Sequence, residues 1–266
     1  MAPPGPPGKY LPKKSINRII CTTKMKNVYF ISDIHLSLSR NDREQEKLKR
    51  LHSFLDFIEP QAEALFILGD LFDFWFEWYH VIPKYWFEVL HHFRKLIDRG
   101  INIHLIKGNH DFHLGQYLQK EVGLFCHDQS YEFSLNNQSF YIAHGDGLAK
   151  KDRGYRLLKR VIRNPLSIFL FKTFLSPDLG FQLAKWTSRS SRSLMQKKRG
   201  YWSEEYFQAA RKKFEKGFDY VILGHLHVPE IRTRGRHVYV NCGDWIAEFS
   251  YALYHNHSLS LHSWDQ

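Results

Sequence analysis

The sequence predicts an α/β protein in which helices cover a sheet of parallel strands. Short apolar runs that end in Asp, Asn or His alternate with segments whose apolar residues recur at helical spacing, and this alternation is typical of strands joined by helical connections. The composition agrees, because a chain of 266 residues with 43% hydrophobic and 24% charged residues can bury one large core and carry an inserted part.

The first half of the chain shows the alternation most clearly. Buried strands have continuous apolar runs, whereas amphipathic helices repeat apolar residues every three or four positions. By these patterns, strands are expected at residues 27–32, 64–68 and 101–106, and helices at residues 43–59 and 85–99.

The second half has a different pattern. Two apolar runs, residues 131–135 and 139–143, flank Asn136-Asn137, a pair typical of a tight hairpin turn. Further strands are expected at residues 220–223 and 237–241, with helical patterns between them and the hairpin.

The long stretch between the hairpin and residue 217 carries most of the net charge. Residues 147–216 hold 18 lysine and arginine residues against 5 acidic ones, in a chain whose net charge is +11. Such an excess indicates nucleic acid, an acidic membrane surface or a phosphorylated substrate as partner, although a solvated helical face would look similar. We expect residues 147–216 to form a basic, apolar helical cap inserted into a core made of residues 25–146 and 217–266.

The N-terminal segment, residues 1–24, begins Met-Ala-Pro-Pro-Gly-Pro-Pro-Gly and is expected to form a disordered basic leader without a signal peptide. No apolar run approaches the ~20 residues that a transmembrane helix needs. The three cysteines, Cys21, Cys126 and Cys242, lack metal-binding spacing, which favours reduced thiols and a cytoplasmic location.

Polar side chains follow the expected strands at the points where they end. They are Asp33 and His35, then Asp70, then Asn109, His110 and Asp111, then His144, and finally His225 and His227. The carboxyl ends of strands in an open α/β sheet are where ligand sites are expected. All of these side chains are oxygen or imidazole donors and none is a thiolate, a set that suits Mn, Fe or Zn.

The spacing of these donors favours two ions. In an extended chain, residues two apart point to the same side, so Asp33 and His35 form one expected pair. His225 and His227 form another. Asp70 stands alone, and its carboxylate can bridge two cations, which at a separation of ~3.5–4 Å clamp a phosphoryl group and activate water. A lone histidine after a strand is more often structural than a ligand, but chance assembly of five such motifs is remote.

Taken together, the motifs resemble the signature of the calcineurin-like metallophosphoesterases. They are Asp33-x-His35, Gly69-Asp70-x-x-Asp73, Gly108-Asn109-His110-Asp111, His144-Gly145-Asp146 and Gly224-His225-x-His227. The resemblance implies a four-layer α/β/β/α sandwich with an inserted helical cap and a dinuclear site.

The same resemblance assigns a role to each donor. It implies one ion held by Asp33, His35, Asp70 and His227, and another held by Asp70, Asn109, His144 and His225. It implies that Asp73 orients a ligand. It also implies that His110, backed by Asp111, is the catalytic residue that stabilises the transition state or protonates the leaving oxygen.

The predicted cap adds a more specific resemblance, to the UDP-2,3-diacylglucosamine hydrolases of lipid A synthesis. The similar segments are Gly69-Asp-Leu-Phe-Asp-Phe-Trp75, Asp152-Arg-Gly-Tyr155, Asn164-Pro165, Pro177-Asp-Leu-Gly180 and Trp186-Thr-Ser-Arg189-Ser-Ser-Arg192. That family uses an activated water to attack the α-phosphate of an amphiphilic nucleotide-sugar lipid, giving UMP and 2,3-diacylglucosamine 1-phosphate. Its members work with Mn²⁺ as peripheral proteins on the cytoplasmic face of the inner membrane of Gram-negative-type bacteria.

This resemblance implies two divalent metal ions in this chain, with Mn²⁺ expected first and Fe or Zn as alternatives. It implies substrate contacts for Asn109, Asp152, Tyr155, Ser188, Arg189, Arg192 and His225. One position departs from the pattern, because the best-studied branch has arginine where this chain has His110, the residue of the wider superfamily.

The apolar part of the predicted cap separates the alternatives. Residues 166–175 are mostly apolar and can lie in a membrane interface, line an acyl pocket, or simply pack the cap onto the sheet. A nuclease or nucleotide phosphodiesterase would share the metal motifs and use the basic cap on nucleic acid, but fewer large aliphatic residues would be expected there. A non-catalytic membrane-binding module would not need an intact ligand set. We therefore predict a hydrolase in peripheral contact with the membrane, with no nucleic-acid partner.

Overall fold

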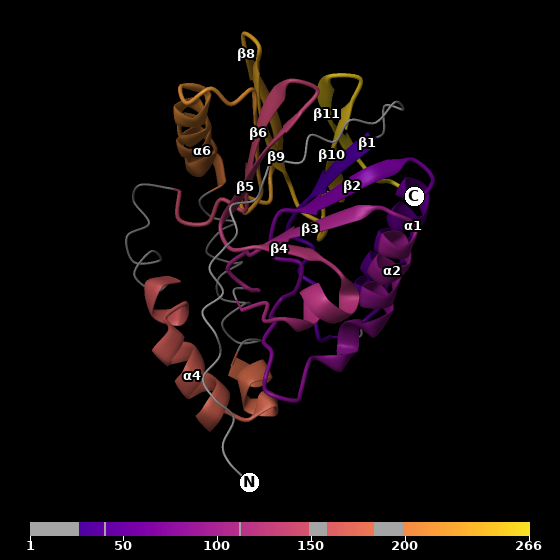
Figure 1. Cartoon of the computed structure of the whole chain (residues 1–266), viewed down its shortest axis with the longest axis vertical. Coiled ribbons are helices and arrows are strands. Elements are labelled where there is room, and N and C mark those ends of the chain that lie inside the picture. The colour runs from indigo at the N-terminus through magenta and orange to yellow at the C-terminus, as the bar shows by residue number, and fades with distance from the viewer. Residues whose placement is uncertain (1–26, 40, 112, 149–158, 184–198) are drawn as a thin grey trace.

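The computed structural model of the chain describes residues 27–39, 41–111, 113–148, 159–183 and 199–266 (Figure 1). Within these residues two β-sheets lie face to face and helices cover their outer faces. The predicted order of layers, α/β/β/α, is confirmed.

The first sheet has the strand order β11-β10-β1-β2-β3-β4. Its strands are β1 (Asn27–Ile31), β2 (Ala62–Ile67), β3 (Asn102–Ile106), β4 (Phe125–His127), β10 (Ser250–His255) and β11 (Ser258–Ser263). Strands β1 to β4 are parallel, as the alternation predicts, whereas β10 runs antiparallel to β1 and brings the C-terminal segment into this sheet.

The second sheet has the order β5-β6-β7-β9-β8. Its strands are β5 (Ser130–Leu135), β6 (Gln138–Ala143), β7 (Tyr220–Leu223), β8 (Pro229–Arg234) and β9 (His237–Cys242). The predicted hairpin is confirmed, since Leu135 pairs with Gln138. Asn136 and Asn137 between them have φ values of 52° and 59°, the left-handed backbone that a two-residue turn of this kind requires.

Two helices cover the outer face of the first sheet where helices were predicted. They are α1 (Asp42–Ile58) and α2 (Phe87–Asp98), with the 3-10 turn η1 (Lys84–Trp86) before α2 and the π-helical turn η2 (Leu118–Val122) before β4. The Asn41 side chain accepts a hydrogen bond from the Glu44 backbone N–H at 3.0 Å and so caps α1. Phe54 of α1 and Phe93 of α2 are fully buried against the sheet.

Aromatic rings fill the space between the two sheets. Phe30, Phe66, Phe133 and Phe140 form a stacked series in which neighbouring ring centroids lie 5.2, 5.1 and 4.7 Å apart. Full burial of a phenylalanine side chain stabilises the folded state by about 1.5–3 kcal/mol. This packing fixes the two sheets against each other, and therefore fixes the strand ends that carry the polar motifs.

The helix α6 (Arg199–Phe214) covers the second sheet and forms the fourth layer. Trp202, Tyr206, Ala210 and Phe214 recur at every fourth position and pack as one buried stripe against β6, β7 and β9. This helix lies inside the range predicted as the cap, residues 147–216, yet its apolar stripe makes it a layer of the core.

The part of the predicted cap that remains is described over residues 159–183, which include the helix α4 (Pro165–Phe174). Asn164 caps this helix through its side chain. Ile168 and Phe171 pack against Phe74, Phe76 and Trp78 of the loop that follows β2.

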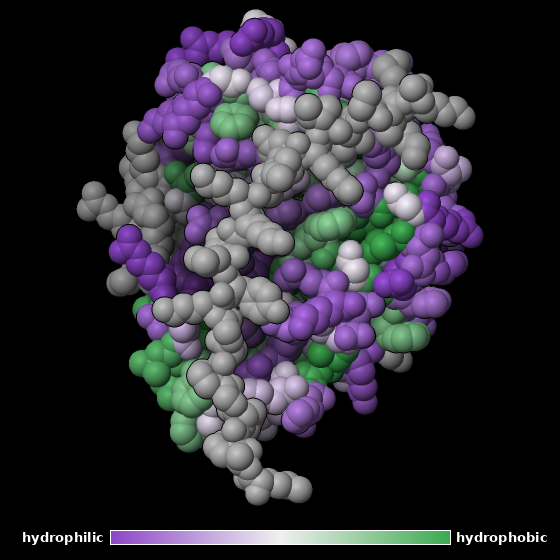
Figure 2. Space-filling view, in the orientation of Figure 1, coloured by the Kyte–Doolittle hydropathy of each residue, from purple (hydrophilic) through white to green (hydrophobic). Residues whose placement is uncertain are grey.

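The opposite face of α4 is apolar and exposed, and Figure 2 shows it as a hydrophobic area at the lower left of the molecule. Its residues are Leu166, Phe169, Leu170 and Phe174, with exposed fractions of 65%, 53%, 45% and 78%. None of the helices in the described ranges is long and apolar enough to cross a membrane.

Candidate metal centre

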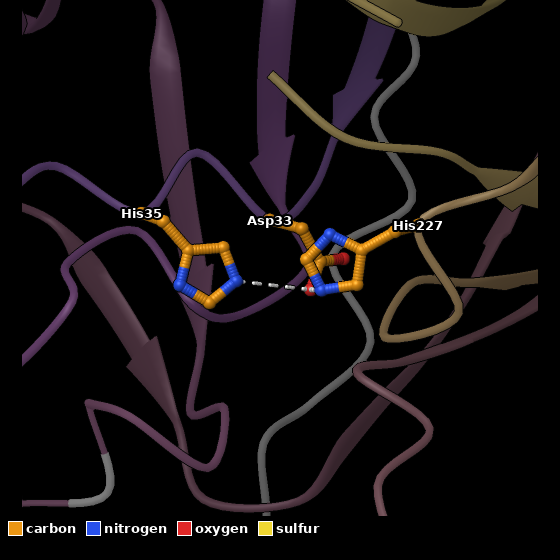
Figure 3. A group of neighbouring side chains, drawn as sticks. All are labelled: Asp33, His35 and His227. Atoms are coloured by element: carbon orange, nitrogen blue, oxygen red, sulfur yellow. Dashed lines mark ion pairs between the residues drawn. The ribbon is translucent and has the colours of Figure 1, made fainter. Parts of the chain in front are cut away.

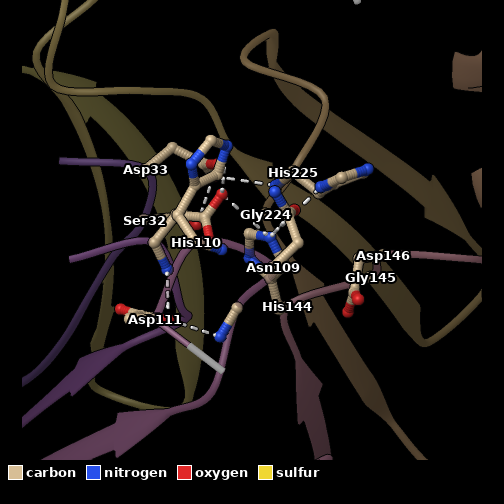
Figure 4. A network of polar contacts seen from close by, with 12 residues as sticks. Ser32, Asp33, Asn109, His110, Asp111, His144, Gly145, Asp146, Gly224 and His225 are labelled. Atoms are coloured by element: carbon tan, nitrogen blue, oxygen red, sulfur yellow. Dashed lines mark hydrogen bonds and ion pairs between the residues drawn. The ribbon is translucent and has the colours of Figure 1, made fainter. Parts of the chain in front are cut away.

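The donors that follow separate strands meet in one buried place. The side chains are those of Asp33, His35, Asp70, Asn109, His110, His144, His225 and His227, and all but Asn109 and His110 are less than 9% exposed. They come from loops after β1, β2, β3, β6 and β7, so both sheets contribute. Figure 4 shows most of them turned toward a common centre.

Five of these residues have left-handed backbone. The φ values are 54° for Asp33, 49° for His35, 51° for Asp70, 71° for His225 and 56° for His227. This conformation costs a non-glycine residue roughly 1–2 kcal/mol, and such strain concentrates at functional sites. The prediction that Asp33 with His35, and His225 with His227, lie in extended chain was therefore wrong, because both members of each pair have left-handed backbone.

The first group of donors surrounds one carboxylate oxygen of Asp33 (Figure 3). Asp33 Oδ1 lies 3.4 Å from His227 Nε2 and 3.7 Å from His35 Nε2. Its other oxygen, Oδ2, accepts a hydrogen bond from the His225 backbone N–H at 2.7 Å, which fixes the carboxylate. We call Asp33, His35, Asp70 and His227 the first position.

The second group meets at Asp70, Asn109, His144 and His225, which we call the second position. His144 Nε2 lies 3.1 Å from Asn109 Oδ1, 3.1 Å from His225 Nδ1 and 3.4 Å from Asp70 Oδ2. The same oxygen of Asp70 lies 3.6 Å from His35 Nε2. Asp70 Oδ2 therefore faces both positions, whereas Oδ1 accepts a hydrogen bond from the His110 backbone N–H at 2.9 Å.

The donor atoms fit a pair of divalent cations. Asp33 Oδ1 and both ring nitrogens of His35 are buried without a hydrogen-bond partner in the described part of the chain. Groups of three donors, Asp33 with His35 and His227, and Asp70 with His144 and His225, have ligand atoms within 4.8 Å of one another. Imidazole and carboxylate donors of this kind suit borderline metals such as Mn, Fe and Zn.

The electrostatics of the site favour added positive charge. Burial lowers the pKa of His144, but Asp70 raises it more, to about 10. Burial also lowers the pKa of His35, but Asp33 and Asp73 raise it to about 9. Metal ligation requires neutral imidazole, so binding of divalent cations here releases protons.

His110 lies beside His35 and Asp70, and these three residues form a further group of donors within 4.8 Å of one another. Its ring Nδ1 lies 3.0 Å from the Asp73 carbonyl oxygen, and its Nε2 lies 3.9 Å from Asp70 Oδ2. Asp111 was predicted to back His110. Its carboxylate instead accepts hydrogen bonds from the backbone N–H groups of Gly108, Leu71 and Asp70, at 2.7, 2.8 and 3.3 Å. Asp111 is therefore a residue that positions the Asp70 loop.

Two further carboxylates orient the histidines of the first position. Asp73 Oδ1 lies 3.3 Å from His35 Nδ1, in the orienting place that the family resemblance implies. Asp244, for which no role was predicted, lies with Oδ2 3.1 Å from His227 Nδ1. Its other oxygen accepts three backbone N–H groups, from Ile246, Ala247 and Glu248. The available signal was its place after β9, since every other motif also follows a strand.

A buried lysine supports the same position from behind. Lys47 of α1 donates to the backbone carbonyl of His35 at 2.6 Å and pairs with Glu44 at 2.8 Å. The other oxygen of Glu44 accepts from the Ser37 backbone N–H at 2.8 Å. The strained turn that carries His35 is thus held by the first turns of α1.

Comparison with known proteins identifies the family. The model of one family, the calcineurin-like phosphoesterases, matches residues 26–229 of this chain. The chain belongs to that family. As a calcineurin-like phosphoesterase it is a hydrolase that uses divalent metal ions.

Alignments with similar proteins cover most of the chain of this phosphoesterase. It is 32% identical to a UDP-2,3-diacylglucosamine hydrolase of Porphyromonas gingivalis in an alignment that covers 89% of this chain and 97% of the relative. It is 30% identical to a protein of the same name from Haemophilus influenzae over 86% of this chain and 94% of the relative. A third protein of that name, from Neisseria meningitidis, is 30% identical over the same shares.

Five of the predicted substrate contacts lie outside the described residues. They are Asp152, Tyr155, Ser188, Arg189 and Arg192. The other two, Asn109 and His225, lie in the second position. Residues 1–24, predicted to form a leader, also lie outside the described residues.

Replacing Asp244 with asparagine is expected to weaken binding of the ion at the first position by about 10–100-fold. Asparagine can still accept the backbone N–H groups, but it presents an NH₂ group to His227 Nδ1 and so favours the tautomer whose Nε2 carries the proton. Metal titration by calorimetry measures the change, with the exposed Asp265→Asn as control. An unchanged affinity would show that Asp244 does not orient His227.

Proposed function

We propose that this chain hydrolyses the pyrophosphate bond of UDP-2,3-diacylglucosamine at the α-phosphate, giving UMP and 2,3-diacylglucosamine 1-phosphate. The observation that carries the proposal is the similarity to hydrolases of that name over most of both chains. The complete set of buried donors supports it, because a non-catalytic relative would not need them all.

The donors form two separate ion sites beside the proposed place of the phosphates. We propose that the first and second positions each hold one divalent ion, Mn²⁺ being our choice of metal. Such a pair, when bound, polarises the phosphoryl group and activates the attacking water. Asp70 Oδ2 faces both positions. The backbone N–H of His110 donates a hydrogen bond to Asp70 Oδ1 and so holds the carboxylate in this orientation.

His110 is placed to act on the leaving oxygen. The Asp73 carbonyl accepts the proton of Nδ1, so Nε2 is the nitrogen that faces the site. Burial lowers the pKa of His110, and the negative charge of a bound diphosphate opposes that effect. The protonated ring then donates from Nε2 to the oxygen of the leaving group.

The test of the proposal is Mn²⁺-dependent release of UMP from UDP-2,3-diacylglucosamine in detergent micelles. The expected result is turnover that disappears when the ions are removed by chelation and returns when Mn²⁺ is restored. Activity on a simple phosphodiester such as bis-p-nitrophenyl phosphate, without UMP release, would retain the phosphoesterase chemistry and reject this substrate.

We further propose that the exposed face of α4 contacts the inner membrane from the cytoplasmic side. Four large apolar side chains are exposed on one helix that also carries Lys172, in a part of the chain with excess basic residues. Such a surface binds at the headgroup boundary, helped by anionic lipids. It also suits a substrate with acyl chains.

The variant that tests this membrane contact carries Phe169→Glu and Phe174→Glu. Vesicles that contain anionic lipid should co-sediment at least about tenfold less of it, because each charge opposes burial in the interface. The control is Phe87→Glu on α2, a residue that is 68% exposed but lies away from the cap. Equal binding of all three proteins would contradict membrane contact through α4.

A further inference from the structure

The first and second positions differ in what holds their donors in place. The first position is supported by groups of the core, namely Lys47 behind His35 and Asp244 behind His227. The second position draws Asn109 from the loop after β3 and His144 from the loop after β6. Both of these loops are contacted by the cap.

The contacts come from a short helical segment at the start of the described cap. Lys159 and Arg163 are one turn apart, joined by the Arg163 N–H bond to the Lys159 carbonyl at 3.0 Å, so their side chains lie on one face. Arg163 Nη2 donates to the Gly108 carbonyl at 2.7 Å. Lys159 Nζ lies 2.7 Å from Asp146 Oδ2, which is also 3.7 Å from Arg163 Nη2.

Both anchor points adjoin donors of the second position. Gly108 directly precedes Asn109, and a side chain at Gly108 would collide with the Asp70 carboxylate, so the backbone of this loop lies directly against Asp70. Asp146 lies two residues after His144 and its side chain is only 6% exposed. A buried carboxylate is costly unless it is paired, and the cap supplies the pairing cations.

We propose that Lys159 and Arg163 are positioning residues that tie the cap to the loops of Asn109 and His144, so that docking of the cap completes the second position. The first position then binds its ion without these two contacts, and the second binds tightly only when Lys159 and Arg163 make them. The proposal rests on the two-ion centre of the proposed function, but not on the identity of the substrate.

The test is calorimetric titration of the metal-free full chain with Mn²⁺, comparing wild type with Lys159→Ala/Arg163→Ala. The wild type should take up two ions. The variant should bind one ion as before and the other about tenfold or more weakly, the size of effect typical when support of a ligand is lost. The matched control is Arg160→Ala, an exposed cation on the same turn.

Further variants separate loss of these contacts from other causes of weaker metal binding. Lys159→Arg/Arg163→Lys keeps both donors and should restore most of the second affinity. Asn109→Ala should weaken the same binding step, and combining it with Arg163→Ala should cost less than the sum of the two effects, because both act on one donor. Thermal unfolding in chelator checks that every variant is folded.

Equal two-ion binding by the wild type and Lys159→Ala/Arg163→Ala would overturn the proposed positioning role of Lys159 and Arg163 while leaving the dinuclear centre intact. An equal loss of affinity for both ions would also overturn this role, since the two residues would then support both positions alike. A wild type that binds fewer than two ions would overturn both the dinuclear centre and the positioning role of Lys159 and Arg163.

Discussion

Asp70→Asn should lower kcat/KM for UMP release about a thousandfold or more and leave the purified chain with fewer than two ions. The pair of ions contributes several kcal/mol of transition-state stabilisation, and each 1.36 kcal/mol is a factor of ten in rate. Asp70 Oδ2 is the oxygen that faces His35 on one side and His144 on the other, so one substitution affects both positions.

Metal content by mass spectrometry and initial rates of UMP release measure the two effects together. Asp98→Asn on α2 is the control, because this aspartate is 55% exposed and pairs only with Arg94 in the same helix among the ion pairs of the described residues. If Asp70→Asn kept two tightly bound ions and its activity, the assignment of a bridging carboxylate to this residue would be wrong.

His110→Ala should lower kcat by about 10²–10⁴, with KM and metal content close to those of the wild type. The reason is the role proposed for His110, which acts on the leaving oxygen from a site where its Nε2 lies 3.9 Å from Asp70 Oδ2, while other side chains hold the ions. His110→Arg should retain more activity than His110→Ala, since an arginine restores positive charge next to the phosphates.

Single-turnover rates with the ions in excess separate this effect from loss of metal, and His91→Ala on the outer helix α2 serves as the control. A large fall in bound metal in His110→Ala would show that His110 acts as a ligand. A fall in affinity for substrate at unchanged kcat would show that it binds the diphosphate in the ground state.

The order of strands and motifs was predictable from the sequence because buried parallel strands have continuous apolar runs. The runs that became β1, β2 and β3 ended within about two residues of the predicted positions, since a polar ligand marks each end. The strands β10 and β11 were not predicted, and β11 alternates polar and apolar residues where the predicted strands have continuous apolar runs. Their turn, Asn256-His257, has left-handed φ values of 48° and 61°, a hairpin signal that histidine hides.

The donors of the site were predictable by residue type, but their supports were not. Lys47 and Glu44 are the only buried polar residues of the helix α1, and nothing in their spacing distinguishes this pair. Asp111 follows His110 in sequence, which suggested a side-chain partnership. The chain turns there, so the carboxylate points to backbone N–H groups of another loop. Supports of this kind depend on tertiary contacts between distant segments.

The hydrogen bond between the His225 N–H and Asp33 Oδ2 joins residues that are 192 positions apart. A ribosome adds about 5–20 residues per second, so roughly ten seconds or more separate the emergence of the two. During that interval the nascent chain presents Asp33, His35 and Asp70 without the histidines that follow β7. Neither position is therefore complete until the segment after β7 has been synthesised, and a chain that stops short of β7 lacks both His225 and His227.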